Sequence, residues 1–283
     1  MLTREVVDVY PALTGLTSSH GNNSEAAAKA LQSQLQPLGL IKTAEPRLIA
    51  TLVGPALAPP ASLQDFANRE RDVHRENEAS IRIDSYHRGD QKLFVVYVPG
   101  TRAKTVLPNS DPFDIGSAIG MLADPERSAA HDAVIDAMKR EGVGSADRVV
   151  MVGYSQGGTI AGEIATAHHK LKVDALITFG APIAHLKFSQ SLPIIAIEHG
   201  NDVVPALSGA VNPVTENWLT AARDVELAPG EVSLHAHRID EYVKTAEQLD
   251  RDTGAGSVRM KNKILKLFKG FEFSASNEYQ YSK

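Results

Sequence analysis

The stretch Val149-Val150-Met151-Val152-Gly153-Tyr154-Ser155-Gln156-Gly157-Gly158 decides the fold. Its apolar first half predicts a buried strand, and the residues from Gly157 to His168 predict a helix. Between them lies a Gly-x-Ser-x-Gly pattern, which is typical of a serine nucleophile on a sharp strand-to-helix turn. The glycines remove side chains that would collide in such a turn, and a helix N-terminus favours negative charge that develops beside it. The sequence therefore predicts Ser155 as the nucleophile of a hydrolase.

Strand and helix patterns alternate on both sides of this turn. Buried strands are predicted at Leu93–Val98, Ala175–Phe179 and Ile194–Glu198, an edge strand at Ile81–Tyr86 and a last strand at Asp224–Leu227. Helices are predicted at Phe113–Leu122, Ser128–Glu141 and Arg238–Leu249. This rhythm predicts an α/β fold with a mostly parallel sheet of about five or six strands and helices on both faces.

Composition divides the chain into three parts. Residues 1–78 are predicted to form an N-terminal helical extension of unknown role, with helices at Ser24–Leu35 and Ser62–Glu78. Ser62 and Asp65 have the spacing of a capping box, and the mixed charges that follow indicate a solvated helix face. Residues 79–252 are predicted to form the catalytic α/β domain, and residues 253–283 a flexible hinge followed by a basic amphipathic segment.

The overall composition excludes several classes of function. The 283 residues include no cysteine, which excludes disulfides, a thiol nucleophile and thiolate metal sites. A formal net charge of -5 gives no general electrostatic reason to expect a nucleic-acid partner. The histidines lack the spacing of common metal motifs, so neither a metal nor a cofactor is predicted.

The chain also lacks the marks of export and of membrane insertion. Residues Met1–Leu16 contain charged side chains where a signal peptide has its apolar region. No stretch approaches the roughly 18 consecutive apolar residues of a membrane span. We expect a soluble protein that is, by default, cytoplasmic.

A serine hydroxyl needs a base to become a nucleophile, and the base needs an orienting acid. In a hydrolase of this type the acid follows the nucleophile in the chain, just past the carboxyl end of a strand. Asp202 meets this condition after the strand Ile194–Glu198, and it is the predicted acid. Glu198 is the alternative, although it lies within or at the end of that strand. Asp174 precedes its strand and would point to the opposite end of the sheet.

The base must come from His235 or His237, which are the histidines that follow Asp202. They flank Ala236 ahead of the last predicted helix. Side chains two positions apart in an extended segment point in opposite directions, so at most one of them is expected to meet Ser155. The residues by themselves leave this choice open.

The tetrahedral intermediate of acyl transfer requires backbone donors for its oxyanion. One donor is expected from the N–H of Gln156, the residue after the nucleophile. The second is expected from the loop after Leu93–Val98, where the N–H of Thr101 is the candidate and its hydroxyl is a further one. The alternative is that Pro99-Gly100 forms an ordinary turn.

Several of these segments together resemble the cutinases and related actinobacterial serine esterases, including the hydrolase domains attached to PE and PPE proteins. Gly153-Tyr154-Ser155-Gln156-Gly157 is similar to their nucleophile turn, and Gly100-Thr101 to the step that carries their oxyanion loop. Phe179-Gly180-Ala181-Pro182 and Asn201-Asp202-Val203-Val204-Pro205 resemble their strand-end and acid-bearing segments. The resemblance extends from about Leu93 to Asp250 and implies the α/β-hydrolase fold.

The resemblance also bears on the base and on the reaction. In those families the catalytic histidine tends to precede a tyrosine by five residues, as His237 precedes Tyr242, and this favours His237 over His235. The implied activity is hydrolysis of a small-molecule or lipid acyl ester through an acyl-enzyme. A thioesterase or acyltransferase with the same triad is the alternative, and a non-catalytic interaction module is a further one. Two features depart from the family: this chain lacks the cysteines of cutinases, and residues 1–78 match no part of them.

The C-terminal segment Val258–Phe273 is predicted to be one amphipathic helix. Its apolar face combines Met260, Ile264, Leu267, Phe268 and Phe271, and its lysines lie largely off that face. We expect this helix to dock on the hydrolase core or on a second subunit. Peripheral contact with an anionic membrane is the alternative.

Overall fold

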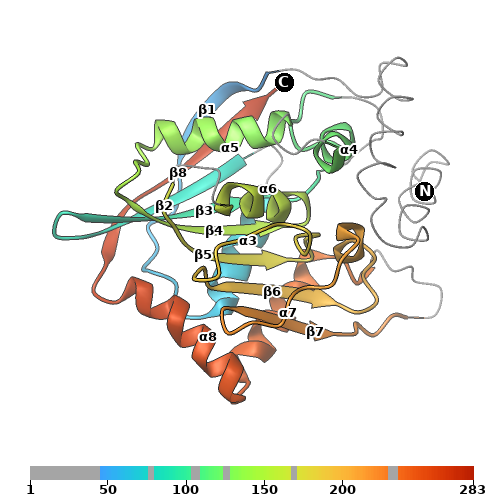
Figure 1. Ribbon diagram of the computed structural model, residues 1–283. Coiled ribbons are helices and arrows are strands. Elements are labelled where there is room, and N and C mark those ends of the chain that lie inside the picture. The colour runs from blue at the N-terminus through green and yellow to red at the C-terminus, as the bar shows by residue number, and fades with distance from the viewer. Residues whose placement is uncertain (1–44, 76–79, 103–108, 124–127, 167–170, 229–234) are drawn as a thin grey trace.

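The computed structural model describes residues 45–75, 80–102, 109–123, 128–166, 171–228 and 235–283 (Figure 1). The helix predicted at Ser24–Leu35 lies outside these residues. In the described part, strands and helices build one sheet with helical layers, as the sequence predicts, although β2 and β3, and also β5, β6 and β7, follow one another without an α-helix between them.

The sheet contains eight strands in the order β1-β8-β2-β3-β4-β5-β6-β7. Their bounds are Arg47–Val53 (β1), Ser80–Arg88 (β2), Gln91–Val98 (β3), Arg148–Tyr154 (β4), Val173–Phe179 (β5), Ile194–His199 (β6), Trp218–Arg223 (β7) and Glu272–Ser282 (β8). The strands from β3 to β7 are parallel and lie side by side in chain order. The strands β2, β8 and β1 extend the sheet beyond β3 in antiparallel pairing. The α/β class with a mostly parallel sheet is confirmed.

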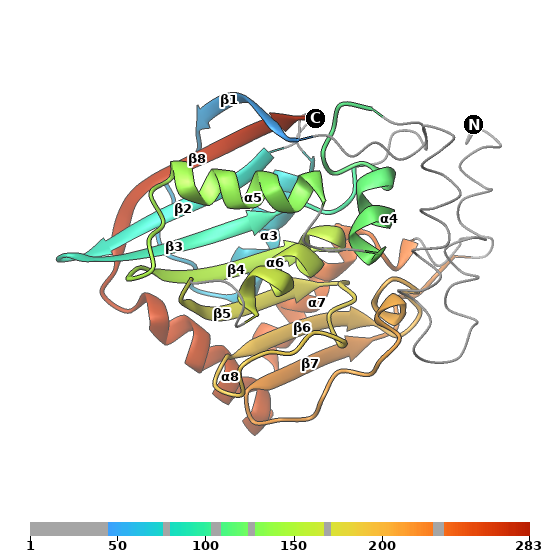
Figure 2. The same cartoon turned by 45° about the horizontal axis from the view of Figure 1, so that its top comes forward.

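The winding of the parallel strands explains where the helices lie. Right-handed crossovers between strands that advance in one direction place their helices on one face of the sheet. That face carries α4 (Ile115–Ala123), α5 (Ala129–Arg140) and α6 (Gln156–Ala165), as Figures 1 and 2 show. The opposite face is covered by α3 (Leu63–Arg75), α7 (Ile239–Arg251) and α8 (Ala255–Leu265), which come before or after the parallel strands in the chain.

Side chains of the central strands alternate between two apolar cores. In β3, Phe94, Val96 and Val98 pack in the core under α5 and α6. The intervening Leu93, Val95 and Tyr97 pack in the core that α3 and α7 cover. Burial on both faces explains why this strand is a continuous apolar run in the sequence.

The C-terminal segment differs from the single helix that the sequence predicts. A helix is present, but α8 ends at Leu265, a short 3₁₀ turn covers Lys266–Phe268, and β8 follows as an internal strand between β1 and β2. β8 escapes prediction because it buries polar side chains: Ser276, for example, donates to the carboxylate of Asp84 on β2 at 2.7 Å. The sheet therefore contains two strands that the sequence does not predict, β8 and β1, and its strand count exceeds the expected five or six.

The apolar side chains of this segment pack against the rest of the protein. Met260, Ile264, Phe268 and Phe271 are buried in the core shared with α3 and α7, so docking on the core is confirmed. Lys261 is buried as well, and its ammonium donates to backbone carbonyls at the end of α7, at Leu249, Asp250 and Asp252.

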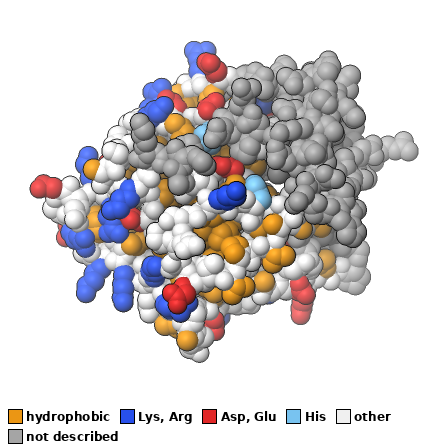
Figure 3. Space-filling view, in the orientation of Figure 1, with side chains coloured by type: hydrophobic (Ala, Val, Ile, Leu, Met, Phe, Trp, Pro, Cys, Tyr) orange, Lys and Arg blue, Asp and Glu red, His pale blue; other side chains and the backbone are white. Residues whose placement is uncertain are grey.

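Other basic side chains gather at the left of the view in Figure 3, the end of the sheet where the parallel strands begin. Contact of the C-terminal segment with a membrane stays a prediction. Among the described residues, no helix combines the length and the apolar character that crossing a membrane requires.

The N-terminal part also departs from expectation. Ser62 caps α3 as predicted, since its hydroxyl accepts from the N–H of Asp65 at 3.0 Å. However, Arg69 is buried rather than solvated, because its guanidinium donates to Asp84 at 3.1 Å and to the Tyr86 hydroxyl at 2.7 Å. The strand at Ile81–Tyr86 is internal, not an edge, because β8 covers it.

The remaining differences concern the last strand and the division of the chain. The last parallel strand is β7 at Trp218–Arg223 instead of Asp224–Leu227, and it forms the edge beside β6. The sheet takes strands from each of the three predicted parts. The division of the chain at residues 78 and 252 stays a prediction.

Candidate active site

Ser155 lies on a strained turn between β4 and α6. Its backbone has φ 53° and ψ -123°, and among the described residues it is the single non-glycine residue with positive φ. A Cβ on Gly153 would lie 2.4 Å from the carbonyl oxygen of Gly157, and one on Gly157 would lie 2.0 Å from the carbonyl oxygen of Val98. Both positions therefore require glycine, as the motif predicts. Strain of this kind persists where the surrounding packing holds it, and it is concentrated at functional sites.

His237 lies between Ser155 and Asp202. Its Nε2 is 2.8 Å from Oγ of Ser155, and its Nδ1 is 2.5 Å from Oδ2 of Asp202. A carboxylate only accepts, so Nδ1 carries the proton and Nε2 is free to accept the proton of the serine hydroxyl. The Asp202 carboxylate is fully buried, and the His237 side chain is 12% exposed. The three side chains thus form one continuous hydrogen-bonded chain with the polarity that general-base chemistry needs.

The parallel sheet brings these residues together. Ser155 follows β4, Asp202 follows β6, and His237 precedes α7, so that all three meet beyond the carboxyl ends of the parallel strands. Asp202 is oriented by its own turn, because its Oδ1 accepts from the N–H of Val204 at 2.9 Å.

The alternative residues lie elsewhere. Glu198 accepts from the amide of Asn212 at 2.6 Å, and burial raises the pKa of its half-buried carboxyl. His235 points toward Glu241, with 3.8 Å between Nε2 and the carboxylate. Asp174 pairs with Arg148 at 2.8 Å, where β4 and β5 begin. The structure therefore brings Asp202 and His237 to Ser155, and leaves these three residues out of the cluster.

The predicted oxyanion donors flank the nucleophile. Gly100 packs so closely that a Cβ there would lie 3.0 Å from Cβ of Ser155, and this approach places Thr101 next to the site. The N–H of Thr101 meets no backbone acceptor within the described part of the chain. Gln156 is the first residue of α6, and the first N–H groups of a helix lack intrahelical acceptors. The Thr101 hydroxyl donates to Oε1 of Gln156 at 3.1 Å, so it is engaged with that side chain and does not point freely into the site.

Aromatic side chains that the sequence does not mark as functional pack around His237. The Tyr154 ring stacks on the imidazole, with 5.1 Å between ring centroids and 28° between planes, and its hydroxyl donates to the His237 carbonyl. His74 from α3 packs edge-on against Tyr154 at 4.8 Å, and burial lowers the pKa of His74 to about 4. Tyr154 occupies one of the unspecified positions of the motif, and His74 lies in a charged helix. The local sequence pattern therefore does not predict that either residue contacts the site.

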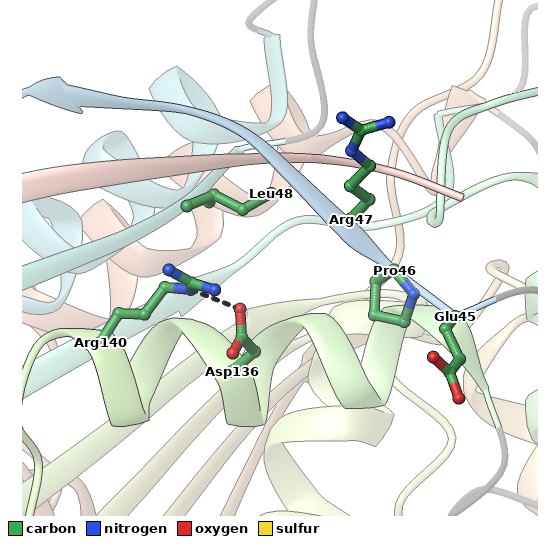
Figure 4. A pocket seen from close by; sticks show the side chains of 6 residues that line it. All are labelled: Glu45, Pro46, Arg47, Leu48, Asp136 and Arg140. Atoms are coloured by element: carbon green, nitrogen blue, oxygen red, sulfur yellow. Dashed lines mark hydrogen bonds and ion pairs between the residues drawn. The ribbon is translucent and has the colours of Figure 1, made fainter.

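A cavity of 570 Å³ lies away from this cluster, between β1 and α5 (Figure 4). Its lining residues are Glu45, Pro46, Arg47, Leu48, Asp136 and Arg140. The carboxylate of Asp136 is paired with Arg140 at 2.6 Å, and no member of the Ser155 cluster lines the cavity. Within the described residues, no group of acidic and histidine side chains has the arrangement of a metal site.

No protein-family model matches the chain, and no curated protein matches it. Among solved structures, a chain described as an alpha-beta serine hydrolase homologue from Coxiella burnetii is similar, with 14% sequence identity and a TM-score of 0.32. The match covers 74% of this chain and 99% of that chain. The mostly parallel eight-stranded sheet with helices on both faces defines the fold class of this protein as α/β.

Proposed function

We propose that this protein is a serine hydrolase that cleaves carboxylic esters through an acyl-enzyme intermediate. The observation that carries the proposal is the unbroken contact from Ser155 Oγ through the His237 imidazole to the buried carboxylate of Asp202. A serine on a strained turn with an oriented imidazole at 2.8 Å is the arrangement of an activated nucleophile.

The reaction follows from these contacts. Oγ of Ser155 attacks the acyl carbon of the ester while Nε2 of His237 takes the hydroxyl proton. The resulting oxyanion accepts from the N–H groups of Thr101 and Gln156, and each such donor contributes on the order of 10²–10³ in rate. Collapse of the intermediate breaks the bond to the alkoxy oxygen, which leaves as an alcohol with the proton from His237. A water molecule, deprotonated by His237, then releases the carboxylic acid, and Asp202 stays ionised throughout.

Reaction with a fluorophosphonate probe tests the assignment of a live nucleophile. We expect covalent labelling of the full-length protein, and the labelled peptide should contain Ser155. An unlabelled protein would favour a non-catalytic hydrolase-fold module. A panel of acyl esters and acyl thioesters of several chain lengths tests the leaving group, because both bonds suit the same triad. Turnover of thioesters alone would replace the ester assignment with a thioesterase.

The acid is tested by one pair of variants. Asp202→Asn should lower kcat by about 10⁴, because an amide in this place holds the imidazole in the wrong tautomer. Glu198→Gln is the matched control, since it makes the same change of acid to amide at the alternative position, and we expect it to keep kcat within a few-fold. The measurement is kcat on one soluble acyl ester. The reverse ranking of the two variants would make Glu198 the acid.

A further inference from the structure

Tyr242 lies buried directly beneath the carboxylate of the catalytic acid. Its hydroxyl donates to Oδ2 of Asp202 at 2.5 Å, and this is the same oxygen that His237 Nδ1 contacts at 2.5 Å. Burial raises the pKa of Tyr242 well above its usual range, so the phenol keeps its proton and remains a donor. One carboxylate oxygen therefore receives two donors, of which only the imidazole takes part in proton transfer.

The fold makes room for this phenol at Gly180. This residue has φ +58°, and a Cβ there would lie 2.5 Å from the hydroxyl oxygen of Tyr242. Any other residue at this position would push the phenol away from Asp202. The reaction makes no other use of Gly180, although it lies in the Phe179-Gly180-Ala181-Pro182 segment just past β5.

His199 holds Tyr242 from the other side. Its ring is stacked on the phenol, with 4.0 Å between centroids and 14° between planes. Its Nδ1 is 2.6 Å from the carbonyl oxygen of Ala236, which only accepts, so Nδ1 carries the proton. Its Nε2, 2.8 Å from the hydroxyl of Thr245, is then an acceptor. One imidazole thus links the ring beneath the acid to the backbone that immediately precedes His237.

We propose that Tyr242 is a positioning residue that fixes the Asp202 carboxylate and, by sharing its charge, sets the acid limit of the pH range in which His237 acts as a base. The inference rests on the proposed function, since it concerns the same triad. A carboxylate that donates part of its electron density to a phenol stabilises an adjacent imidazolium less. Removal of the phenol should therefore let His237 hold its proton to a higher pH.

Other charged or titratable groups also face this cluster. They are Glu198 and His199 from β6, Tyr154 from β4, His74 from α3, Glu241 from α7, Arg223 from β7 and Arg102 beyond β3. Burial lowers the pKa of both His74 and His199, so both imidazoles are neutral at neutral pH. All of these groups are unchanged in the variants below, so a difference between variants reports on the phenol.

The experiment measures the rate of Ser155 labelling by a fluorophosphonate between pH 5 and 9 for the wild type, Tyr242→Phe and Tyr281→Phe. Tyr281→Phe is the matched control, because the buried Tyr281 also donates to a carboxylate, that of Asp136 at 2.8 Å. Tyr281 packs in the core on the opposite face of the sheet from Tyr242. We expect Tyr242→Phe to move the acid limb upward by about half a pH unit or more and to lower the plateau rate about tenfold. Tyr281→Phe should keep the wild-type profile.

Gly180→Ala provides a second variant, should Tyr242→Phe fail to fold. Its methyl group displaces the phenol without removing it, and we expect an upward shift of the acid limb here as well. Wild-type profiles in both folded variants would overturn the positioning role and leave the proposed function intact. A wild-type protein that is never labelled at Ser155 would instead overturn the proposed function, and the inference about Tyr242 with it.

Discussion

Ser155→Ala should abolish ester turnover, with kcat lower by on the order of 10⁶. The substitution removes the one oxygen that lies within hydrogen-bond distance of the His237 Nε2, at 2.8 Å, and no other described hydroxyl takes its place. The binding groups and the oxyanion donors remain, so a small residual rate above that of water is expected. The measurements are steady-state kinetics on a soluble acyl ester and intact mass after exposure to the fluorophosphonate.

Ser85→Ala is a suitable control for this variant. Ser85 on β2 is as buried as Ser155, each being 8% exposed, and its hydroxyl donates to a backbone carbonyl, that of Ala275. It should retain turnover and labelling. Both proteins should show the same cooperative thermal unfolding as the wild type. Full labelling of the Ser155→Ala protein on another serine would show that the nucleophile lies elsewhere.

His237→Ala should be about as damaging as Ser155→Ala, and the double variant should be scarcely worse, because the residues of a triad act as a unit. Without the imidazole, no group among the described residues takes its place as acceptor of the serine proton, and the buried carboxylate of Asp202 loses one of its donors. The comparison requires kcat of both single variants and of the double variant on one soluble ester.

His235→Ala is the matched control for the base, since it removes the same side chain two positions away. The imidazole of His235 lies 3.8 Å from the carboxylate of Glu241 and outside the Ser155 cluster, so we expect this variant to retain most of the activity. An inactive His235→Ala protein beside an active His237→Ala protein would reverse the assignment.

The parts of the site that sequence predicts well are those in which a local pattern has one physical meaning. The turn from Val149 to Gly158 combines an apolar run, two obligatory glycines and a helix start, and the geometry around Ser155 agrees with each of them. The position of Asp202 follows because side chains just beyond parallel strands share one edge of the sheet. The choice of His237 over His235 needed the resemblance to known esterases, because local chemistry treats two neighbouring histidines alike.

What the sequence could not reveal depends on partners that lie far away in the chain. The local sequence predicts a solvated Arg69, because its buried partners Asp84 and Tyr86 come from another element of the fold. The residues of β8 have the polar composition of an exposed tail, and the hydrogen bond from the Ser276 hydroxyl to the Asp84 carboxylate cannot be inferred from them alone. The role of His199 is hidden for the same reason, since its contacts at Ala236 and Thr245 come from the following helix region. Long-range pairing of polar groups has no periodicity for a local reading to detect.

The insertion of β8 between β1 and β2 has a consequence for how the molecule is made. During synthesis the ribosome releases β1 and β2 early. β2 can pair with β3 at once, but β1 and the other edge of β2 must wait for Glu272–Ser282, since Ser85 and Ala275 are hydrogen-bonded across 190 positions of the chain. The strands from β3 to β7 can assemble before that segment emerges, since each pairs with its neighbour in order. Closing so long a loop is slow, and an unpaired strand edge invites association with other chains in the meantime. We therefore expect the nascent protein to pass through a stage in which β3 to β7 are paired and one edge of β2 still lacks its partner β8.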